Sequence, residues 1–267
     1  MNKYIFSYMV MFLLSACGGG GTPTGKVTTP FEDSSGDPTK VTDNLVTPNN
    51  REQSEYQILI LGNSHVIGLE SLLVMIFDND NVNKSVSITT RTGTFLDTIV
   101  DNESIIGLLQ NREWTHIILQ GQKYSQSQSV LYPINATITW IQRAKAVGAT
   151  PILFPEHPLL NNPQDAEYVQ SIHDGIAAEQ SSCVAPVGLT WNQVLLISPS
   201  LDVHQADGNH ATDLGALLSS MVLYETISGE PADLLPFIDI LPADRATQSL
   251  FGQVTSQTIT ANIPCDF

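Results

Sequence analysis

The chain alternates between short apolar runs and segments whose apolar residues return every three or four positions. It begins this alternation with "YQILILG" (56–62), a continuous apolar run that ends in glycine and is typical of a buried strand. The segment that follows, "VIGLESLLVMIF" (66–77), has its apolar residues at helical spacing. A buried strand followed by an amphipathic helix predicts the first unit of a parallel α/β sheet.

The alternation continues through most of the chain. We expect four more strands, at 84–93, 115–120, 150–156 and 183–188, and four more helices, at 103–111, 136–149, 163–180 and 212–229. Strands that are apolar on both faces and separated by helices predict a three-layer α/β/α domain with a central, mostly parallel five-stranded sheet. In such a sheet the active site lies beyond the carboxyl ends of the strands.

The amino-terminal part of the chain lacks this pattern. Residues 1–16 combine Lys3 with an apolar run, 8–14, that is too short to span a bilayer, which is typical of a signal peptide. The run ends in "LSAC", which resembles the lipobox of bacterial lipoproteins and implies cleavage before a lipid-bearing Cys17. The alternative is an ordinary signal peptide with Cys17 near the cut by chance.

Residues 17–54 are rich in Gly, Thr, Pro, Ser and Asp and show no apolar period, so we expect a flexible linker after the lipidated cysteine. The remaining residues, 55–267, are enough for one domain with a proper core. The lipobox implies a bacterial cell-envelope protein that is held to the membrane by its lipid alone, with its domain facing the periplasm or the exterior. Gly18, rather than aspartate, after the cysteine favours the outer membrane if the cell is Gram-negative.

The charge and the cysteines restrict the partners further. A net charge of −16 at pH 7 argues against nucleic acid or an anionic membrane surface as a partner. No phosphate-binding glycine fingerprint is found, and we expect a monomer without a cofactor. An exported compartment permits a disulfide between Cys183 and Cys265, with two free thiols as the alternative. Neither cysteine has a second cysteine or a histidine at metal-ligand spacing.

A serine stands where the first strand meets the first helix. The step "GNSH" (62–65) places Ser64 at the positive end of a helix, which stabilises a nearby anion. A serine is a weak nucleophile unless a base lies within hydrogen-bond reach and a third group orients that base. Asp207 and His210, three residues apart in "DGNHATDLG", can meet through a turn that leaves Nε2 free. Alone the pair is more often a hydrogen-bonded loop, but together with Ser64 it predicts a catalytic triad.

Four segments in this order resemble the SGNH (GDSL) hydrolase superfamily. They are Gly62-Asn63-Ser64, the glycine of "RTGTFL" at Gly93, "LQGQ" at 119–122, and Asp207-x-x-His210, within about residues 56–228. The "VAPVG" segment is similar to one found in a subset of that family. The resemblance implies the flavodoxin-like fold of these hydrolases. It also implies a serine esterase or acyltransferase that acts on a short acyl ester of a carbohydrate or another small or envelope substrate.

The resemblance also implies a role for each matching residue. Ser64 would be the nucleophile that forms an acyl-enzyme, His210 the general base and then acid, and Asp207 the residue that orients the histidine. The oxyanion hole would consist of the backbone N–H groups of Ser64 and Gly93 and a side-chain amide, for which we choose Gln122.

Two positions depart from the family pattern. Asn63 stands where the family more often has aspartate, a residue that supports the turn and does no chemistry. The third block normally supplies asparagine as Gly-x-Asn, but here it offers Gln120 and Gln122. Gln122 is preferred because the strand is expected to end near Leu119, and Gln120 remains the alternative.

Other interpretations account for less of the sequence. An α/β-hydrolase elbow requires Gly-x-Ser-x-Gly, but Val66 follows His65. A metal site could use Asp202, His204, Asp207 and His210, yet no distant ligand completes it, so we expect no metal. An interpretation from a different class is a catalytically silent lipoprotein that binds a glycan or an envelope component, which the glutamine in the third block keeps open.

The other histidines have less specific interpretations. His65 either lines the pocket or packs at the start of the helix, while Glu156 and His157, at the end of the fourth strand, are candidates for contact with substrate. His116 and His173 are expected to be structural.

Overall fold

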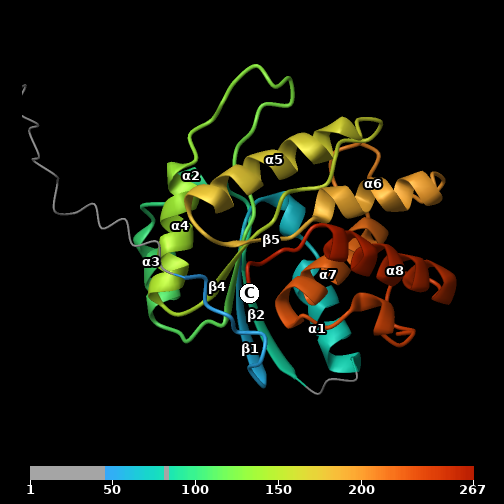
Figure 1. The fold of residues 1–267 in the computed structure, drawn as a ribbon, viewed down its shortest axis with the longest axis horizontal. Coiled ribbons are helices and arrows are strands. Elements are labelled where there is room, and N and C mark those ends of the chain that lie inside the picture. The colour runs from blue at the N-terminus through green and yellow to red at the C-terminus, as the bar shows by residue number, and fades with distance from the viewer. Residues whose placement is uncertain (1–45, 81–83) are drawn as a thin grey trace, which may run out of the picture. The chain divides into compact units, whose positions relative to one another are not determined.

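A sheet of five strands forms the centre of the domain (Figure 1). The computed structural model describes residues 46–80 and 84–267. The strands are β1 (Glu55–Leu61), β2 (Ser85–Arg91), β3 (His116–Leu119), β4 (Thr150–Leu153) and β5 (Cys183–Val184), in the order β2-β1-β3-β4-β5. Every pairing is parallel, which confirms the predicted sheet. The predicted signal peptide and Cys17 lie outside the described residues.

Helices cover both faces of the sheet, as Figure 1 shows. One face is covered by α1 (Leu69–Asn79), α6 (Val187–Ile197), α7 (Asp213–Ser228) and α8 (Arg245–Ala261). The other is covered by α2 (Leu96–Ile99), α3 (Glu103–Gln110), α4 (Asn135–Ala146) and α5 (Gln164–Glu179). Two short 3₁₀ helices, η1 (Ser64–Val66) and η2 (Ala232–Leu234), complete the described elements. The predicted three-layer architecture is therefore confirmed.

Strand β1 lies between β2 and β3 and is covered by helices on both faces, which explains its apolar sequence. Its side chains point alternately to the two faces, so Ile58 and Ile60 enter the core beneath α1 and α7, while Leu59 and Leu61 enter the core beneath α4. All four are fully buried. From Ile58 onwards the strand is covered on both faces and carries only apolar side chains, until it ends immediately before the Gly62 turn.

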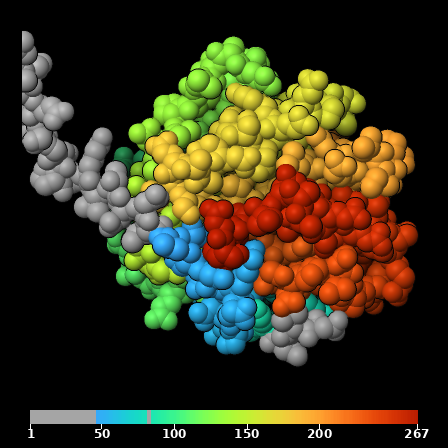
Figure 2. Space-filling view, in the orientation of Figure 1, coloured from blue at the N-terminus to red at the C-terminus, as the bar shows by residue number. Residues whose placement is uncertain are grey.

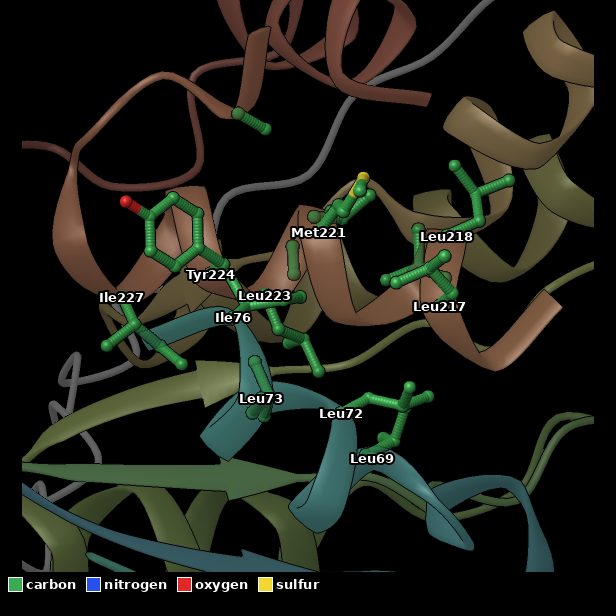
Figure 3. Close-up of a cluster of buried hydrophobic side chains, with 14 of the residues drawn as sticks. Leu69, Leu72, Leu73, Ile76, Leu217, Leu218, Met221, Leu223, Tyr224 and Ile227 are labelled. Atoms are coloured by element: carbon green, nitrogen blue, oxygen red, sulfur yellow. The ribbon is translucent and has the colours of Figure 1, made fainter. Parts of the chain in front are cut away.

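Helix α7 is buried along almost its whole length because it lies between α1 and α8. Figure 3 shows its leucine, methionine and tyrosine side chains facing Leu69, Leu73 and their neighbours on α1. The hydroxyl oxygen of Thr212 accepts a hydrogen bond from the N–H of Gly215, as expected for the predicted cap. The end of α7 that bears this cap also follows directly on the Asp207–His210 segment.

Several elements differ from the sequence prediction, among them the short helix α2 and helix α6, neither of which was predicted. The fifth strand ends at Val184 rather than at 188, because Pro186 has no N–H for the ladder and instead precedes the first turn of α6. Helix α8 was not predicted, since its sequence is rich in threonine, serine and glutamine. It forms because Phe251 and Val254 are buried in the core.

The folded domain begins before residue 55, so the predicted linker boundary at 54 requires correction. The side chain of Asn50 donates to the carbonyls of Thr115 (2.9 Å) and Gly148 (3.0 Å) and to the hydroxyl of Thr150 (3.0 Å). These partners lie where β3 and β4 begin. Residues 46–54 are therefore part of the domain, docked at the amino ends of the strands.

The carboxy-terminal tail lies beside this amino-terminal segment, as the adjacent blue and red surfaces of Figure 2 show. The guanidinium of Arg51 lies 5.1 Å from the ring centre of Phe267. The predicted disulfide between Cys183 and Cys265 is present and joins the tail to β5. Both ends of the described chain are thus fixed to the sheet.

Candidate active site

The nucleophile candidate lies in the tight turn that follows β1, where η1 begins. Asn63 caps η1, with its side-chain oxygen accepting from the N–H of His65 at 3.0 Å. Ser64 is the first residue of η1. A Cβ at Gly62 would lie 2.5 Å from the side-chain oxygen of Gln120 and 2.7 Å from Val66, so only glycine fits there. The absence of a side chain at Gly62 therefore allows the buried Gln120 to pack against this turn.

The three predicted triad residues are brought together in hydrogen-bond contact. Ser64 Oγ lies 2.8 Å from His210 Nε2, and His210 Nδ1 lies 2.6 Å from Asp207 Oδ2. The other oxygen of Asp207 accepts from the backbone N–H groups of His210 (3.0 Å) and Asn209 (2.9 Å). These contacts, the one from His210 N–H above all, hold the pKa of Asp207 well below its ordinary value. A carboxylate at Nδ1 requires the hydrogen there, which leaves Nε2 to accept the serine proton.

The Asp207–His210 turn is fixed from behind by His157. Because a carbonyl can only accept, the ring Nε2–H of His157 donates to the carbonyl of Asn209, at 2.9 Å. Burial, followed by the nearby His65, lowers the pKa of His157 to about 3, so the ring remains neutral and keeps this tautomer. His157 therefore supports the Asp207–His210 turn and does not line the cavity, whereas the sequence had suggested contact with substrate.

His65 is stacked on the imidazole of His210. Its ring centre is 5.3 Å from that of His210, with 17° between the planes. The ring of His65 also meets the edge of His157, with centres 5.1 Å apart. Both interpretations of His65 from the sequence apply, because the residue lines the pocket and packs at the start of η1.

Ser64 and Gly93 are the two predicted backbone donors of the oxyanion hole. Ser64, at the start of η1, and Gly93, after β2, both line the same cavity. Within the described residues neither N–H group has a hydrogen-bond acceptor. Gly93 has a φ of 95°, a conformation that glycine adopts without strain. Their placement agrees with two of the three predicted oxyanion donors.

Gln122 does not complete the oxyanion hole, which corrects the choice made from the sequence. Its amide Nε2 donates to the carbonyls of Lys123 (2.8 Å) and Pro133 (3.3 Å), and its oxygen accepts from the hydroxyl of Thr137 (2.6 Å). The chain turns at Gly121, where φ is 99°, and directs the next side chain towards α4. Both hydrogens of the Gln122 amide are occupied away from Ser64.

Gln120, the alternative donor, is also occupied. Its Nε2 donates to Glu156 at 2.8 Å, and its Oε1 accepts from the N–H of Asn63 at 2.8 Å. The side chain lies fully buried beneath the nucleophile turn. Both amide hydrogens of Gln122 are thus bonded elsewhere, and Gln120, with one amide hydrogen bonded to Glu156, is fully buried and does not line the cavity beside Ser64.

A cavity of about 730 Å³ opens beside the triad. It has the size of a typical small-molecule site. Its wall consists of Asn63, Ser64, His65, Gly93, Phe95, Lys123, Tyr124, Gln126, Tyr132, Glu156, Asn209 and His210. Glu156, considered from the sequence as a candidate for contact with substrate, lines this cavity. The aromatic residues of the wall were not identified from the sequence, and the position of the loop directly after β3 was the available signal.

The four residues considered as metal ligands do not converge. His204 Nε2 donates to the carbonyl of Pro158 at 2.8 Å, while Asp207 and His210 bind each other. Over residues 46–80 and 84–267 no group of three or more His, Cys, Asp or Glu side chains is arranged to hold a metal ion. In the same part of the chain, none of the helices has the length and apolarity that crossing a membrane requires.

Comparison with solved structures identifies the fold. A protein described as an SGNH hydrolase from Slackia heliotrinireducens has a TM-score of 0.52 and 19% sequence identity, and the match covers 64% of this chain and 98% of that one. The chain has the SGNH hydrolase fold. In this SGNH fold the predicted blocks follow neighbouring strands, with Ser64 after β1, Gly93 after β2 and Gln120 after β3.

A second solved structure extends further over the chain. A DUF4886 family protein from Bacteroides uniformis has a TM-score of 0.60 and 12% identity, and the match covers 79% of this chain and 97% of that one. No protein-family model matches the sequence, and the search of curated proteins finds no match. The chain thus shares its fold with both proteins at low sequence identity.

Proposed function

We propose that the protein is a serine esterase that forms an acyl-enzyme at Ser64. The observation that supports this most strongly is the continuous hydrogen-bond chain from Ser64 through His210 to Asp207 at the wall of a cavity. Each member has the contact that its role requires, and two backbone N–H groups without acceptors line the same space. A chain that only bound a ligand would have no need for this arrangement.

Acylation follows from the geometry. Ser64 Oγ attacks the ester carbonyl carbon while His210 Nε2 takes its proton, and the carbonyl electron pair moves onto oxygen. The N–H groups of Ser64 and Gly93 stabilise that oxyanion, and one such donor is typically worth about 3 kcal/mol of barrier. As the carbon–oxygen bond breaks, His210 returns the proton to the leaving alcohol. Asp207 stabilises the imidazolium that exists between the two transfers.

Deacylation repeats the cycle with a second nucleophile. Water, deprotonated by His210, attacks the acyl carbon, and Ser64 leaves with the proton restored. If a sugar hydroxyl takes the place of water, the same residues perform acyl transfer. We propose hydrolysis as the main reaction, with transfer as its variant.

The proposed substrate is a neutral glycan that carries a short acyl group. The cavity presents amides from Gln126 and Asn209 beside the rings of Phe95 and Tyr132, which are 40% and 42% exposed. Sugars combine polar edges with apolar faces, and this mixture of groups fits both. The ammonium of Lys123 in the wall is paired with an aspartate, so it offers little attraction to an anionic substrate.

We also propose that Cys17 carries a lipid and that the domain resides in the bacterial envelope. Cys17 lies outside the described residues, so this proposal rests on the lipobox-like sequence. Replacement of Cys17 by alanine should move the protein from the membrane fraction to the soluble fraction.

The esterase proposal is tested with a fluorophosphonate probe and an aryl acetate ester. Ser64→Ala should abolish labelling and lower kcat by at least about 10⁴-fold, because the nucleophile is lost. Ser71→Ala is the matched control, since Ser71 is an exposed serine on α1 whose hydroxyl donates only to the carbonyl of Gly68. It should leave both measurements unchanged.

Two results would contradict the proposal. Equal labelling of the wild type and Ser64→Ala would show that another residue is the nucleophile. A folded wild type that neither labels nor hydrolyses a panel of acetylated aryl esters and glycans would favour the silent binding lipoprotein instead.

A further inference from the structure

Glu156 lies in the cavity wall without being a member of the triad. It follows β4 and its side chain is only 12% exposed. Its Oε2 accepts from the amide of Gln120, and its Oε1 accepts from the hydroxyl of Tyr124, each at 2.8 Å. Both oxygens of a nearly buried carboxylate are thus used to hold other residues of the site.

These contacts determine which way the Gln120 amide points. A carboxylate only accepts, so the NH₂ of Gln120 must face Glu156 and its oxygen must face the N–H of Asn63. In the reverse orientation the NH₂ would oppose the Asn63 N–H and the oxygen would oppose the carboxylate. Two buried groups would then lose their partners, which is costly. The hydrogen bonds that link Glu156, Gln120 and Asn63 therefore have only one favourable direction.

Asn63, the last residue in this series of hydrogen bonds, directly precedes Ser64. The Asn63 N–H belongs to the peptide that links it to Gly62, and the next residue carries both the reacting hydroxyl and one oxyanion donor. The absence of a Cβ at Gly62 is what allows Gln120 to lie against this peptide. A change in the Gln120 amide is thus transmitted to the Ser64 backbone through a single hydrogen bond.

The hydrogen bond from Tyr124 to Glu156 joins this series of hydrogen bonds to a loop that lines the cavity. Tyr124 lies on the loop between β3 and α4, which extends beyond the end of the sheet (Figure 1). Burial, followed by the charges of Glu156 and Asp165, raises the pKa of the Tyr124 hydroxyl, so the hydroxyl remains a donor. Glu156 therefore fixes both Gln120, which lies beneath the Ser64 turn, and Tyr124, which lines the cavity.

We propose that Glu156 is a positioning residue for the reaction, acting through the amide of Gln120 on the backbone at Asn63 and Ser64. The proposal rests on the esterase function proposed above. It explains why the third block carries a glutamine where the family pattern has a donor asparagine. The amide supports the turn, and the oxyanion is left to the backbone groups of Ser64 and Gly93.

Exchanging the side chains of Gln120 and Glu156 tests the direction of these hydrogen bonds. Gln120→Glu places two carboxylates against each other and should lower kcat at pH 7 by about tenfold or more, with KM nearly unchanged. Adding Glu156→Gln restores every contact between the two positions in reverse, because the carboxylate introduced at position 120 then accepts from both the Asn63 N–H and the amide introduced at position 156. The double variant should recover kcat to within about threefold of the wild type. Gln122→Leu is the matched control, since that buried amide bonds only outside the triad.

The readouts are kcat, KM and the rate of fluorophosphonate labelling, measured well below the melting temperature of each variant. Full kcat in Gln120→Glu, or no recovery in the double variant, would overturn the proposal. If Gln120→Glu does not fold, Glu156→Leu replaces it and should show the same fall in kcat, whereas an unchanged kcat would overturn the proposal. An inactive, unlabelled wild type would instead refute the esterase function itself.

Discussion

Replacing His116 by phenylalanine should make the domain more resistant to acid. His116 lies in β3, is 1% exposed, and has a pKa lowered to about 3, first by burial and then by the charges of Arg51 and Lys84. In the unfolded chain the histidine pKa is about 6.5. Between these values the unfolded chain binds a proton that the folded domain does not, so the free energy of unfolding falls as the pH falls below 6.5.

The size of the change in the free energy of unfolding follows from the pH interval over which the histidine of the unfolded chain takes up its proton. From pH 7 to pH 5 one such histidine removes about 2 kcal/mol from the free energy of unfolding. Phenylalanine has no proton to bind and keeps the edge contact with the Tyr56 ring. It also leaves no new unpaired group, because the Thr115 hydroxyl next to His116 Nδ1 retains its bond to the carbonyl of Gln57. The wild type and the variant thus differ mainly in this one titration.

Urea unfolding of both proteins at pH 7 and pH 5 provides the measurement. The wild type should lose about 2 kcal/mol more than His116→Phe between the two pH values. Other buried groups, such as His173 with its pKa lowered to about 4 by burial, titrate in both proteins and cancel in the difference. Equal losses in the two proteins would refute the assignment of a neutral, buried His116.

Two further predictions concern residues outside the triad. His157→Phe should lower kcat by about tenfold, because the turn loses the hydrogen bond to the Asn209 carbonyl. His173→Phe is the control, since His173 is equally buried but lies on α5, and it should keep the wild-type kcat. Equal kcat values for the two variants in steady-state kinetics would contradict this prediction. Replacement of Cys183 and Cys265 by alanine should lower the free energy of unfolding by about 4 kcal/mol, because the disulfide closes a separation of 82 residues. Urea unfolding measures the change, and a loss below about 1 kcal/mol would mean that other contacts already hold the tail.

The fold could be predicted where hydrophobic periodicity and burial agree. Strand β1 and helix α7 were identifiable because each has the apolar pattern that its fully buried position requires. Helix α8 was not, since its many threonine and serine residues weaken intrinsic helix formation. Its stability comes from the burial of Phe251 and Val254 against the other helices, which is a tertiary effect that local propensity does not contain.

The candidate active site likewise combines contacts between residues close in sequence with contacts between distant residues. Asp207 and His210 could be paired from their spacing, because one turn brings them together. Gln122 could not be distinguished from Gln120 in this way. Consecutive loop side chains point in different directions, and the turn at Gly121, where φ is 99°, decides which one lies beneath Ser64. The contact of Gln120 with Glu156, 36 residues away, depends on the packing of β3 against β4.

The docking of residues 46–54 has a consequence for how an anchored enzyme would meet its substrate. Asn50 fixes this segment at the amino ends of β3 and β4, whereas Ser64 lies at the carboxyl end of β1. A strand of seven residues spans roughly 20 Å, so the chain enters the domain at the pole opposite the catalytic opening. If Cys17 carries the proposed lipid, the chain that leads to it joins the domain on the side away from Ser64. Attachment through this end would not use the residues that line the cavity.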